Sequence, residues 1–282
     1  DRDIDVRVSI LPTVHGEKIV LRLLGSGNKT LTLQNLGFPE DKLKIFRKWI
    51  NQPYGMVIIS GPTGSGKSTT LYAALSEIMS EDINITTVED PVEYQIPGIN
   101  QVQMHDEIGL NFSASLRSIL RQDPDVLLIG EIRDEETADI AVKFSLTGHL
   151  VFSTVHANDA PSTITRLLDL GIPPFLLGSS LNLVMAQRLI RTIDKDSKEK
   201  YTPTNEELER MNLTKDANKI DFYRGKPTNS NHNTGYKGRT AIHEILQVNS
   251  DMRQLIYENA NQNAIYETAM KNGMTPLRDA GI

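Results

Sequence analysis

The sequence predicts an α/β fold organised around a phosphate-binding loop. The first observation is the segment Gly61-Pro62-Thr63-Gly64-Ser65-Gly66-Lys67-Ser68, which matches the pattern G-x-x-x-x-G-K-[ST] without gaps. The second is its setting, because residues 56–60 have the composition of a buried strand and residues 68–79 carry apolar side chains at helical spacing. The third is that two later strands, the β-branched segment 84–88 and the apolar segment 126–131, lead into acidic residues. Open α/β sheets bind their ligands at the edge formed by the carboxyl ends of the strands.

The loop has the residue types that a polyphosphate requires. Gly61, Gly64 and Gly66 let the backbone curl tightly enough to aim several N–H groups at phosphate oxygens. Lys67 adds a positive charge that can reach the β and γ phosphates, and the Ser68 hydroxyl can ligate Mg²⁺. The candidate nucleotide-binding residues are Gly61, Pro62, Thr63, Gly64, Ser65, Gly66, Lys67, Ser68 and Thr69.

Composition restricts the class of protein. With 282 residues, of which 39% are hydrophobic and 23% charged, the chain is long enough for one large globular domain or two. Its net charge of -6 disfavours a protein that wraps a nucleic-acid backbone. The lack of cysteine excludes disulfides and thiolate metal sites and suits a reducing compartment. The start, Asp1-Arg2-Asp3, has no initiator methionine and no signal-peptide character, so we expect a fragment of a longer protein.

Two alternating segments within residues 6–24 predict a β-hairpin of a small sheet. Arg7 and Arg22 project from its strands, and an ordinary solvated arginine is one interpretation of each. Residues 25–28, Gly-Ser-Gly-Asn, have the glycine content and polarity of a flexible linker. We therefore expect a second domain to begin just after residue 28.

An acidic cluster follows the β-branched strand 84–88. Its residues, Glu89-Asp90-Pro91-Val92-Glu93, would stand at the edge of the sheet where ligands bind. Carboxylates beside a nucleotide can hold Mg²⁺ through water or orient an attacking water, so Glu89 and Glu93 are candidate catalytic residues. A solvated acidic turn before Pro91 is the alternative.

The strand 126–131 is apolar on both faces and ends in Glu131. This acid can ligate Mg²⁺ or act on the lytic water as a general base. Gly130 occupies the position where a second acid often stands, so Glu89 and Glu93 remain alternatives to Glu131 for the general base. Helices are expected over residues 36–49, 68–79, 112–121 and 135–147.

Another strand, 150–154, is followed by Val155-His156-Ala157-Asn158-Asp159. A polar side chain at the end of this strand can sense the γ-phosphate, and His156 or Thr154 could do so. A histidine taken singly is more often structural than catalytic. The setting favours a catalytic role for His156 and leaves both interpretations open for His149.

Together these stretches resemble the bacterial secretion ATPases, the superfamily of type II secretion and type IV pilus motors. The resemblance spans essentially the whole chain. It rests on four ordered motifs, the Walker A, Asp box, Walker B and His box, which are Gly61-Pro62-Thr63-Gly64-Ser65-Gly66-Lys67-Ser68, Val88-Glu89-Asp90-Pro91-Val92-Glu93, Arg121-Gln122-Asp123-Pro124-Asp125 with Gly130-Glu131-Ile132-Arg133-Asp134, and Thr147-Gly148-His149 with Thr154-Val155-His156-Ala157-Asn158-Asp159.

The resemblance implies a RecA-like, hexameric ATPase that uses ATP and Mg²⁺. Such a motor lies in the cytoplasm, at the cytoplasmic face of the bacterial inner membrane, and meets a platform protein there together with a cytoplasmic recruitment protein. It drives the addition of pilin or pseudopilin subunits. By the same resemblance, residues 1–28 are the end of a second N-terminal domain plus its linker, residues 29–282 are the ATPase domain, and Arg7 and Arg22 stabilise the transferring phosphoryl group.

The segment 235–244, Gly-Tyr-Lys-Gly-Arg-Thr-Ala-Ile-His-Glu, resembles the assembly and secretion branch rather than the retraction branch. Many assembly-type members carry four zinc-binding cysteines before it, whereas this chain has none. His232 alone cannot make a tetrahedral site, so we expect no zinc. Residues 194–240 are predicted to form a small polar insert with a weak core, partly mobile, and residues 241–282 a C-terminal helical region.

Two classes of function follow from the sequence. The first is an enzyme that couples ATP hydrolysis to mechanical work. The second is a scaffold that binds ATP and turns it over negligibly, and the acids Glu89, Glu93 and Glu131 favour the enzyme because a pure binder needs only the loop. A retraction-type motor is a further alternative. A DNA-translocating motor conflicts with the acidic balance, so no nucleic-acid partner is expected.

Overall fold

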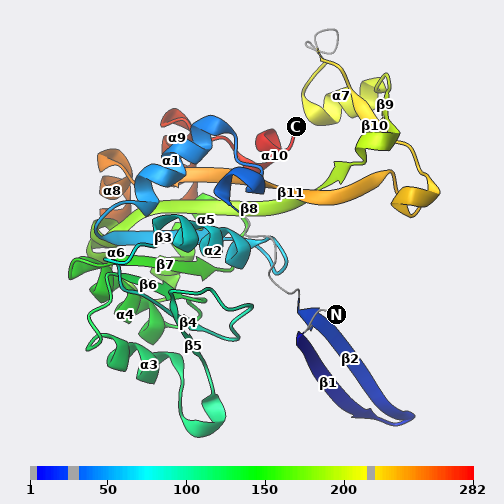
Figure 1. The fold of residues 1–282 in the computed structure, drawn as a ribbon. Helices are drawn as coiled ribbons and strands as arrows, with labels where there is room; N and C mark the ends of the chain where they lie inside the picture. The colour runs from blue at the N-terminus through cyan, green and yellow to red at the C-terminus, as the bar shows by residue number, and fades with distance from the viewer. Residues whose placement is uncertain (1–4, 25–31, 215–219) are drawn as a thin grey trace.

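The structure is a computed structural model that describes residues 5–24, 32–214 and 220–282 (Figure 1). Within these ranges the side chains of residues 5, 7, 22–24 and 106 lie outside the description. None of the described helices combines the length and the apolar character that a membrane span needs.

A seven-stranded sheet forms the centre of the protein, in the order β11-β8-β3-β7-β6-β4-β5. All neighbouring pairs are parallel except β11 and β8, which are antiparallel. Helices cover both faces, as Figure 1 shows, so the predicted α/β class is confirmed. The strands are β3 (Gly55–Ser60), β4 (Ile85–Glu89), β5 (Asn100–Gln103), β6 (Val126–Ile129), β7 (Leu150–Val155), β8 (Leu181–Ile193) and β11 (Tyr236–Gln247).

Alternation along β3 divides the core into two layers. Val57 and Ile59 pack in one cluster with α1 and α2, and Met56 and Ile58 pack in the other with the helices of the opposite face. The helices are α1 (Glu40–Ile50), α2 (Lys67–Ile78), α3 (Phe112–Ile119), α4 (Glu135–Leu146), α5 (Ala160–Asp169), α6 (Pro174–Ser180), α7 (Asn205–Met211), α8 (Ser250–Tyr257), α9 (Gln262–Lys271) and α10 (Leu277–Ala280), with 3-10 turns η1 (Leu33–Leu36), η2 (Asp106–Ile108), η3 (Lys195–Ser197) and η5 (Asn229–Asn231).

The C-terminal region differs from the sequence prediction. Residues 241–247, expected to open a helical region, belong to β11, and the helices begin only at Ser250. Ala241 and Ile245 are buried, and so are the intervening His243 and Glu244. Because β11 is covered on both faces, it lacks the polar–apolar alternation that identifies a half-exposed strand.

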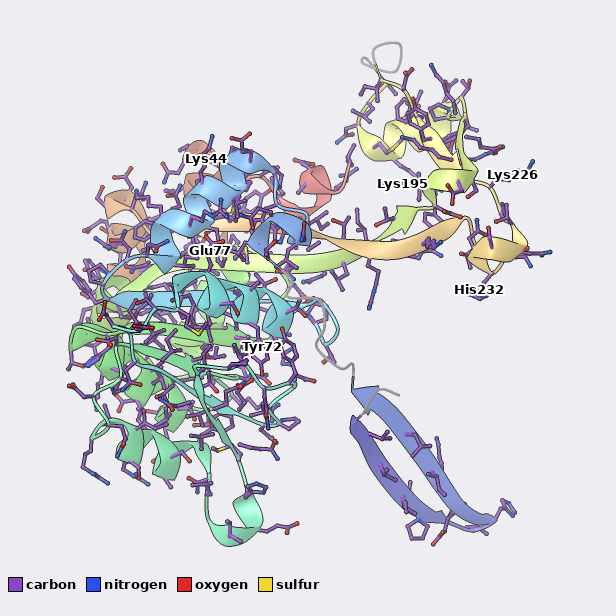
Figure 2. The ribbon with its side chains drawn as sticks, viewed as in Figure 1. Lys44, Tyr72, Glu77, Lys195, Lys226 and His232 are labelled. Atoms are coloured by element: carbon purple, nitrogen blue, oxygen red, sulfur yellow. The ribbon has the colours of Figure 1, made fainter. Side chains whose placement is uncertain are left out.

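The insert between β8 and β11 contains the short strands β9 (Lys198–Lys200) and β10 (Tyr223–Gly225) and helix α7. Lys195, Lys226 and His232 mark it in Figure 2. Asn231 is its buried centre. The Asn231 amide donates to Asp194, Ser197 and the Lys226 carbonyl at 3.0 to 3.1 Å, and its oxygen accepts from the backbone N–H groups of Thr228 and Gly235. A side-chain amide therefore stands at the centre of this insert.

The N-terminal hairpin is confirmed. Strands β1 (Asp5–Thr13) and β2 (Gly16–Leu24) are antiparallel over their whole length, and they form a two-stranded sheet of their own. The predicted linker, residues 25–28, lies outside the described residues.

Candidate functional site

The phosphate loop joins the end of β3 to the first residue of α2. Gly61, Gly64 and Gly66 have φ angles of 148°, 80° and 88°, in the region that side chains rarely adopt. This backbone leaves the N–H groups of the loop and of the helix N-terminus available to an anion. Lys67 Nζ donates to the Gly61 carbonyl at 2.9 Å and to the Pro62 carbonyl at 3.2 Å. Its ammonium therefore lies within the loop itself.

Gln187, on the neighbouring strand β8, holds the phosphate loop in position through hydrogen bonds of its side chain. Its side chain is 1% exposed, and its amide donates to the Ser65 carbonyl at 2.8 Å. The Thr70 hydroxyl on α2 donates to its oxygen at 2.9 Å. A Cβ at Gly66 would lie 2.9 Å from the Gln187 amide nitrogen, so the third loop glycine is also required by this close approach. Sequence analysis missed Gln187 because no motif contains it.

Glu131 lies just beyond β6, beside the loop. Its carboxylate accepts from Arg133 Nε at 2.8 Å, and His156 Nε2 lies 3.2 Å from its other oxygen. Burial lowers the pKa of Lys67, and the negative charge of Glu131 acts in the opposite direction. The structure thus brings together three predicted site residues, Lys67, Glu131 and His156, from three separate strand ends.

Glu89, at the end of β4, has a different environment. It is buried, and one of its oxygens accepts from the Tyr72 hydroxyl at 2.5 Å. The other accepts from the Thr87 hydroxyl at 2.7 Å. Burial raises the pKa of Tyr72, and the adjacent Glu89 charge raises it further. Tyr72 lies on α2, labelled in Figure 2, so the pair joins the helix after the phosphate loop to the end of β4. Both oxygens of Glu89 are occupied.

Glu93 is exposed, and its backbone N–H donates to the Tyr72 hydroxyl at 3.2 Å. The acidic cluster is therefore split between a buried, hydrogen-bonded Glu89 and an open Glu93. This environment favours a structural role for Glu89 over the activation of water, because a buried carboxylate that already accepts two hydroxyl hydrogen bonds is not open to an attacking water.

Thr154 and His149, the two other candidate residues of the His box region, lie at opposite ends of strand β7. The Thr154 hydroxyl donates to the Gly130 carbonyl at 2.8 Å, so it ties β7 to the residue before Glu131. His149 precedes β7 and its carbonyl accepts from the N–H of Gly55, where β3 starts. It therefore lies at the opposite edge of the sheet from the loop. Its ring packs on Phe144 at 4.2 Å, which is a structural contact.

Arg7 and Arg22 face each other in the register of the β1–β2 hairpin. Their side chains lie outside the described part of the structure, so their predicted role stays a prediction.

Ser68 is the second residue of α2, and it offers the hydroxyl that the pattern predicts for Mg²⁺. Over the described ranges, no cluster of three or more His, Asp and Glu side chains could hold a metal by itself. A site whose predicted protein ligand is the Ser68 hydroxyl fits Mg²⁺, because this ion is usually bound by one or two protein groups together with substrate phosphates and water. It does not fit a dedicated all-protein metal cage.

Comparisons with known proteins agree with these motifs. The sequence profile of the family described as Type II/IV secretion system protein matches residues 1–282. The chain is 48% identical over 283 residues to the type II secretion system protein E of Xanthomonas campestris, covering 100% of this chain and 50% of that protein. It is 48% identical over 284 residues to the type IV pilus assembly ATPase PilB of Myxococcus xanthus, with the same coverage. The chain thus spans about half the length of these relatives.

A solved structure of the pilus retraction motor PilT with bound ADP matches with a TM-score of 0.67 and 27% identity. The match covers 98% of this chain and 72% of that one. The predicted RecA-like fold is thereby confirmed.

Proposed function

This chain belongs to the Type II/IV secretion system protein family, and we propose that it is the ATP-hydrolysing core of a motor for pilus or pseudopilus assembly or type II secretion. The observation that carries the proposal is the meeting of Lys67, Glu131 and His156 at the carboxyl edge of the sheet. This is where an open α/β sheet binds a nucleotide.

The chemistry assigned to the site follows from these positions. Lys67 exchanges its two loop carbonyls for phosphate oxygens, while the N-terminus of α2 and the loop N–H groups bind the β-phosphate. Ser68, with Glu131 directly or through water, would hold Mg²⁺, and the bound ion would neutralise phosphate charge. Glu131 orients the attacking water and accepts its proton. His156, whose Nε2 lies 3.2 Å from Glu131, senses the γ-phosphate.

We assign Glu89 to positioning rather than to proton transfer. Its buried carboxylate accepts from the Tyr72 hydroxyl of α2 and from the Thr87 hydroxyl of its own strand, so it joins these two elements. Glu93 is the alternative general base, because it lies at the same strand end and is exposed.

The assembly itself is part of the proposal. A homo-hexamer would bring the hairpin arginines, Arg7 and Arg22, to a nucleotide site of the same or the neighbouring subunit, where they would stabilise the transferring phosphoryl group. The platform protein of the inner membrane and a cytoplasmic recruitment protein are the proposed partners, and the cytoplasmic face of that membrane the proposed location. The 48% identity to an assembly ATPase, against 27% to the retraction motor, favours assembly over retraction.

Nucleotide titration of the Lys67→Ala variant tests the proposal. Removal of the ammonium should weaken binding of a fluorescent ATP analogue by at least ~100-fold, on the scale of ~3 kcal/mol for a charge-assisted contact, while the fold survives. Steady-state phosphate release by the wild-type protein separates an enzyme from a scaffold, since a scaffold binds the analogue without turnover. Affinity retained within a few-fold in Lys67→Ala would place the nucleotide elsewhere.

A further inference from the structure

Arg188 lies against the phosphate loop, although none of the four motifs includes it. It follows Gln187 on β8, and one of its terminal nitrogens lies 3.1 Å from the position that a Cβ would take on Gly61. Gly61 is the first residue of the loop, and its carbonyl accepts from Lys67 Nζ. A second cation is therefore built in at the end of the loop where Lys67 resides.

Two backbone carbonyls hold the Arg188 guanidinium. It donates to the carbonyl of Gln187 at 3.0 Å and to that of Asn158 at 2.7 Å. Asn158 follows His156 in the loop after β7, so the side chain reaches from β8 across the end of β3 to the His box. These bonds fix the position of the guanidinium without neutralising it, because a carbonyl carries no charge. They use two of its five N–H donors, and the others can donate to a ligand oxygen.

The charges around Arg188 also indicate an anion-binding site at the loop. Its positive charge acts on Lys67, whose pKa is lowered first by burial and further by Arg188. The charge of Arg188 acts on Glu244, the acid on the neighbouring strand β11, but the Glu244 carboxylate is hydrogen-bonded to other groups. Its two oxygens accept from the N–H groups of Ala160 and Leu277 at 2.7 and 2.9 Å. Lys67 and Arg188 together place two positive charges at the loop, which favours binding of an anion there.

We propose that Arg188 is a second phosphate-binding residue, which contacts the terminal phosphates of the nucleotide beside Lys67 while its bond to Asn158 keeps the His box loop against the phosphate loop. The inference rests on the proposed function, since it names a further residue of the same nucleotide site. It separates two jobs on adjacent residues of β8: Gln187 fixes the shape of the loop, and Arg188 supplies charge to it.

The test is nucleotide titration in the whole protein, with fluorescent ADP and a fluorescent non-hydrolysable ATP analogue as probes. Arg188→Gln should weaken binding of the ATP analogue at least ~10-fold, the scale of one lost charge-assisted hydrogen bond. Arg188→Lys keeps the charge but not the planar guanidinium, so it should recover part of the affinity that Arg188→Gln loses. The matched control is Arg191→Gln on the same strand, because Arg191 is exposed and stacks on Tyr236 at 4.1 Å; its affinity should equal that of wild type.

Two further measurements make the outcome decisive. Thermal unfolding without nucleotide should differ little among wild type, Arg188→Gln and Arg188→Lys, since the lost bonds are at the edge of the core. Arg188→Gln that binds like wild type, or Arg188→Lys that is as weak as Arg188→Gln, would overturn the proposal, the latter because charge would then not be what matters. Lys67→Ala serves as the reference: if it also binds normally, the proposed function fails as well, whereas weak binding by Lys67→Ala alone rejects only the role of Arg188.

Discussion

Replacement of His243 should reduce the loss in the free energy of unfolding that the protein suffers at acid pH. His243 lies on β11, is 2% exposed and stacks on Phe38 with 3.7 Å between ring centroids and 7° between the ring planes. In the described part of the chain neither ring nitrogen has a hydrogen-bond partner. Burial lowers the pKa of His243 from 6.5 to about 4. The folded protein therefore holds this ring neutral.

The sign of the effect follows from proton binding. Below pH 6.5 the unfolded state takes up a proton on His243 that the folded state does not, so acid shifts the equilibrium toward unfolding. The free energy of unfolding should be unaffected by this residue at pH 7.5. It should fall by about 2 kcal/mol at pH 5, and by about 3 kcal/mol once the pH is below both pKa values, because one pKa unit corresponds to roughly 1.4 kcal/mol.

Urea unfolding of wild type and His243→Phe at pH 7.5 and pH 5 measures this contribution. Phenylalanine keeps an aromatic ring against Phe38 and cannot be protonated, so the stability lost between the two pH values should be smaller by about 2 kcal/mol in the variant. His243→Leu is the second variant, in case the larger ring strains the site. His15→Gln, on the exposed turn of the hairpin, is the control and leaves the buried ring in place. Equal pH dependence in wild type and both His243 variants would refute the reasoning.

Further predictions concern the insert and the two hairpin arginines. Metal analysis should find no stoichiometric zinc, since the chain has no cysteine, and one equivalent per chain would contradict this. Asn231→Leu leaves buried partners of the Asn231 side chain without a hydrogen bond, at a cost of about 1–3 kcal/mol each. Limited proteolysis should therefore cut the insert faster in the variant than in wild type. Addition of a chelator should not change the cleavage rate of the wild-type protein. Arg7→Ala and Arg22→Ala should each keep nucleotide affinity within a few-fold and lose ~10³-fold in turnover. If the arginines act between subunits, mixing Arg22→Ala with Glu131→Gln chains should restore some activity; full activity in both arginine variants would contradict their role.

The sequence predicts the half of the sheet that carries the motifs better than the other half. Strands β3, β4, β6 and β7 are short and apolar, and each leads into the phosphate loop, an acid or the His box, so composition and position agree. Strand β8 ends in an exposed extension and strand β11 begins with one, and both strands are buried where they cross the core. The segment 235–244 resembles a branch of the family, but no periodicity identifies either segment as a strand. Their antiparallel pairing at the edge of a parallel sheet is a tertiary feature that local sequence does not specify.

The site shows the same division. Lys67, Glu131 and His156 could be predicted because each stands at a fixed offset from a strand end. The bond between Glu89 and Tyr72 could not, since it joins residues 17 positions apart through the packing of α2 on the sheet. Gln187 and Arg188 lie more than a hundred residues beyond the loop they contact, on a strand that the sequence does not reveal.

Turnover by Glu131→Gln tests the central claim, that this chain hydrolyses ATP with Glu131 as the base. The substitution keeps the shape and removes the charge, so the variant should bind the fluorescent ATP analogue like wild type. It should release phosphate at least ~100-fold more slowly, the scale of a lost general base. Glu89→Gln and Glu93→Gln, measured beside it, should be less damaging to turnover. Phosphate release by Glu131→Gln at the wild-type rate, or a larger loss in Glu93→Gln, would contradict the assignment.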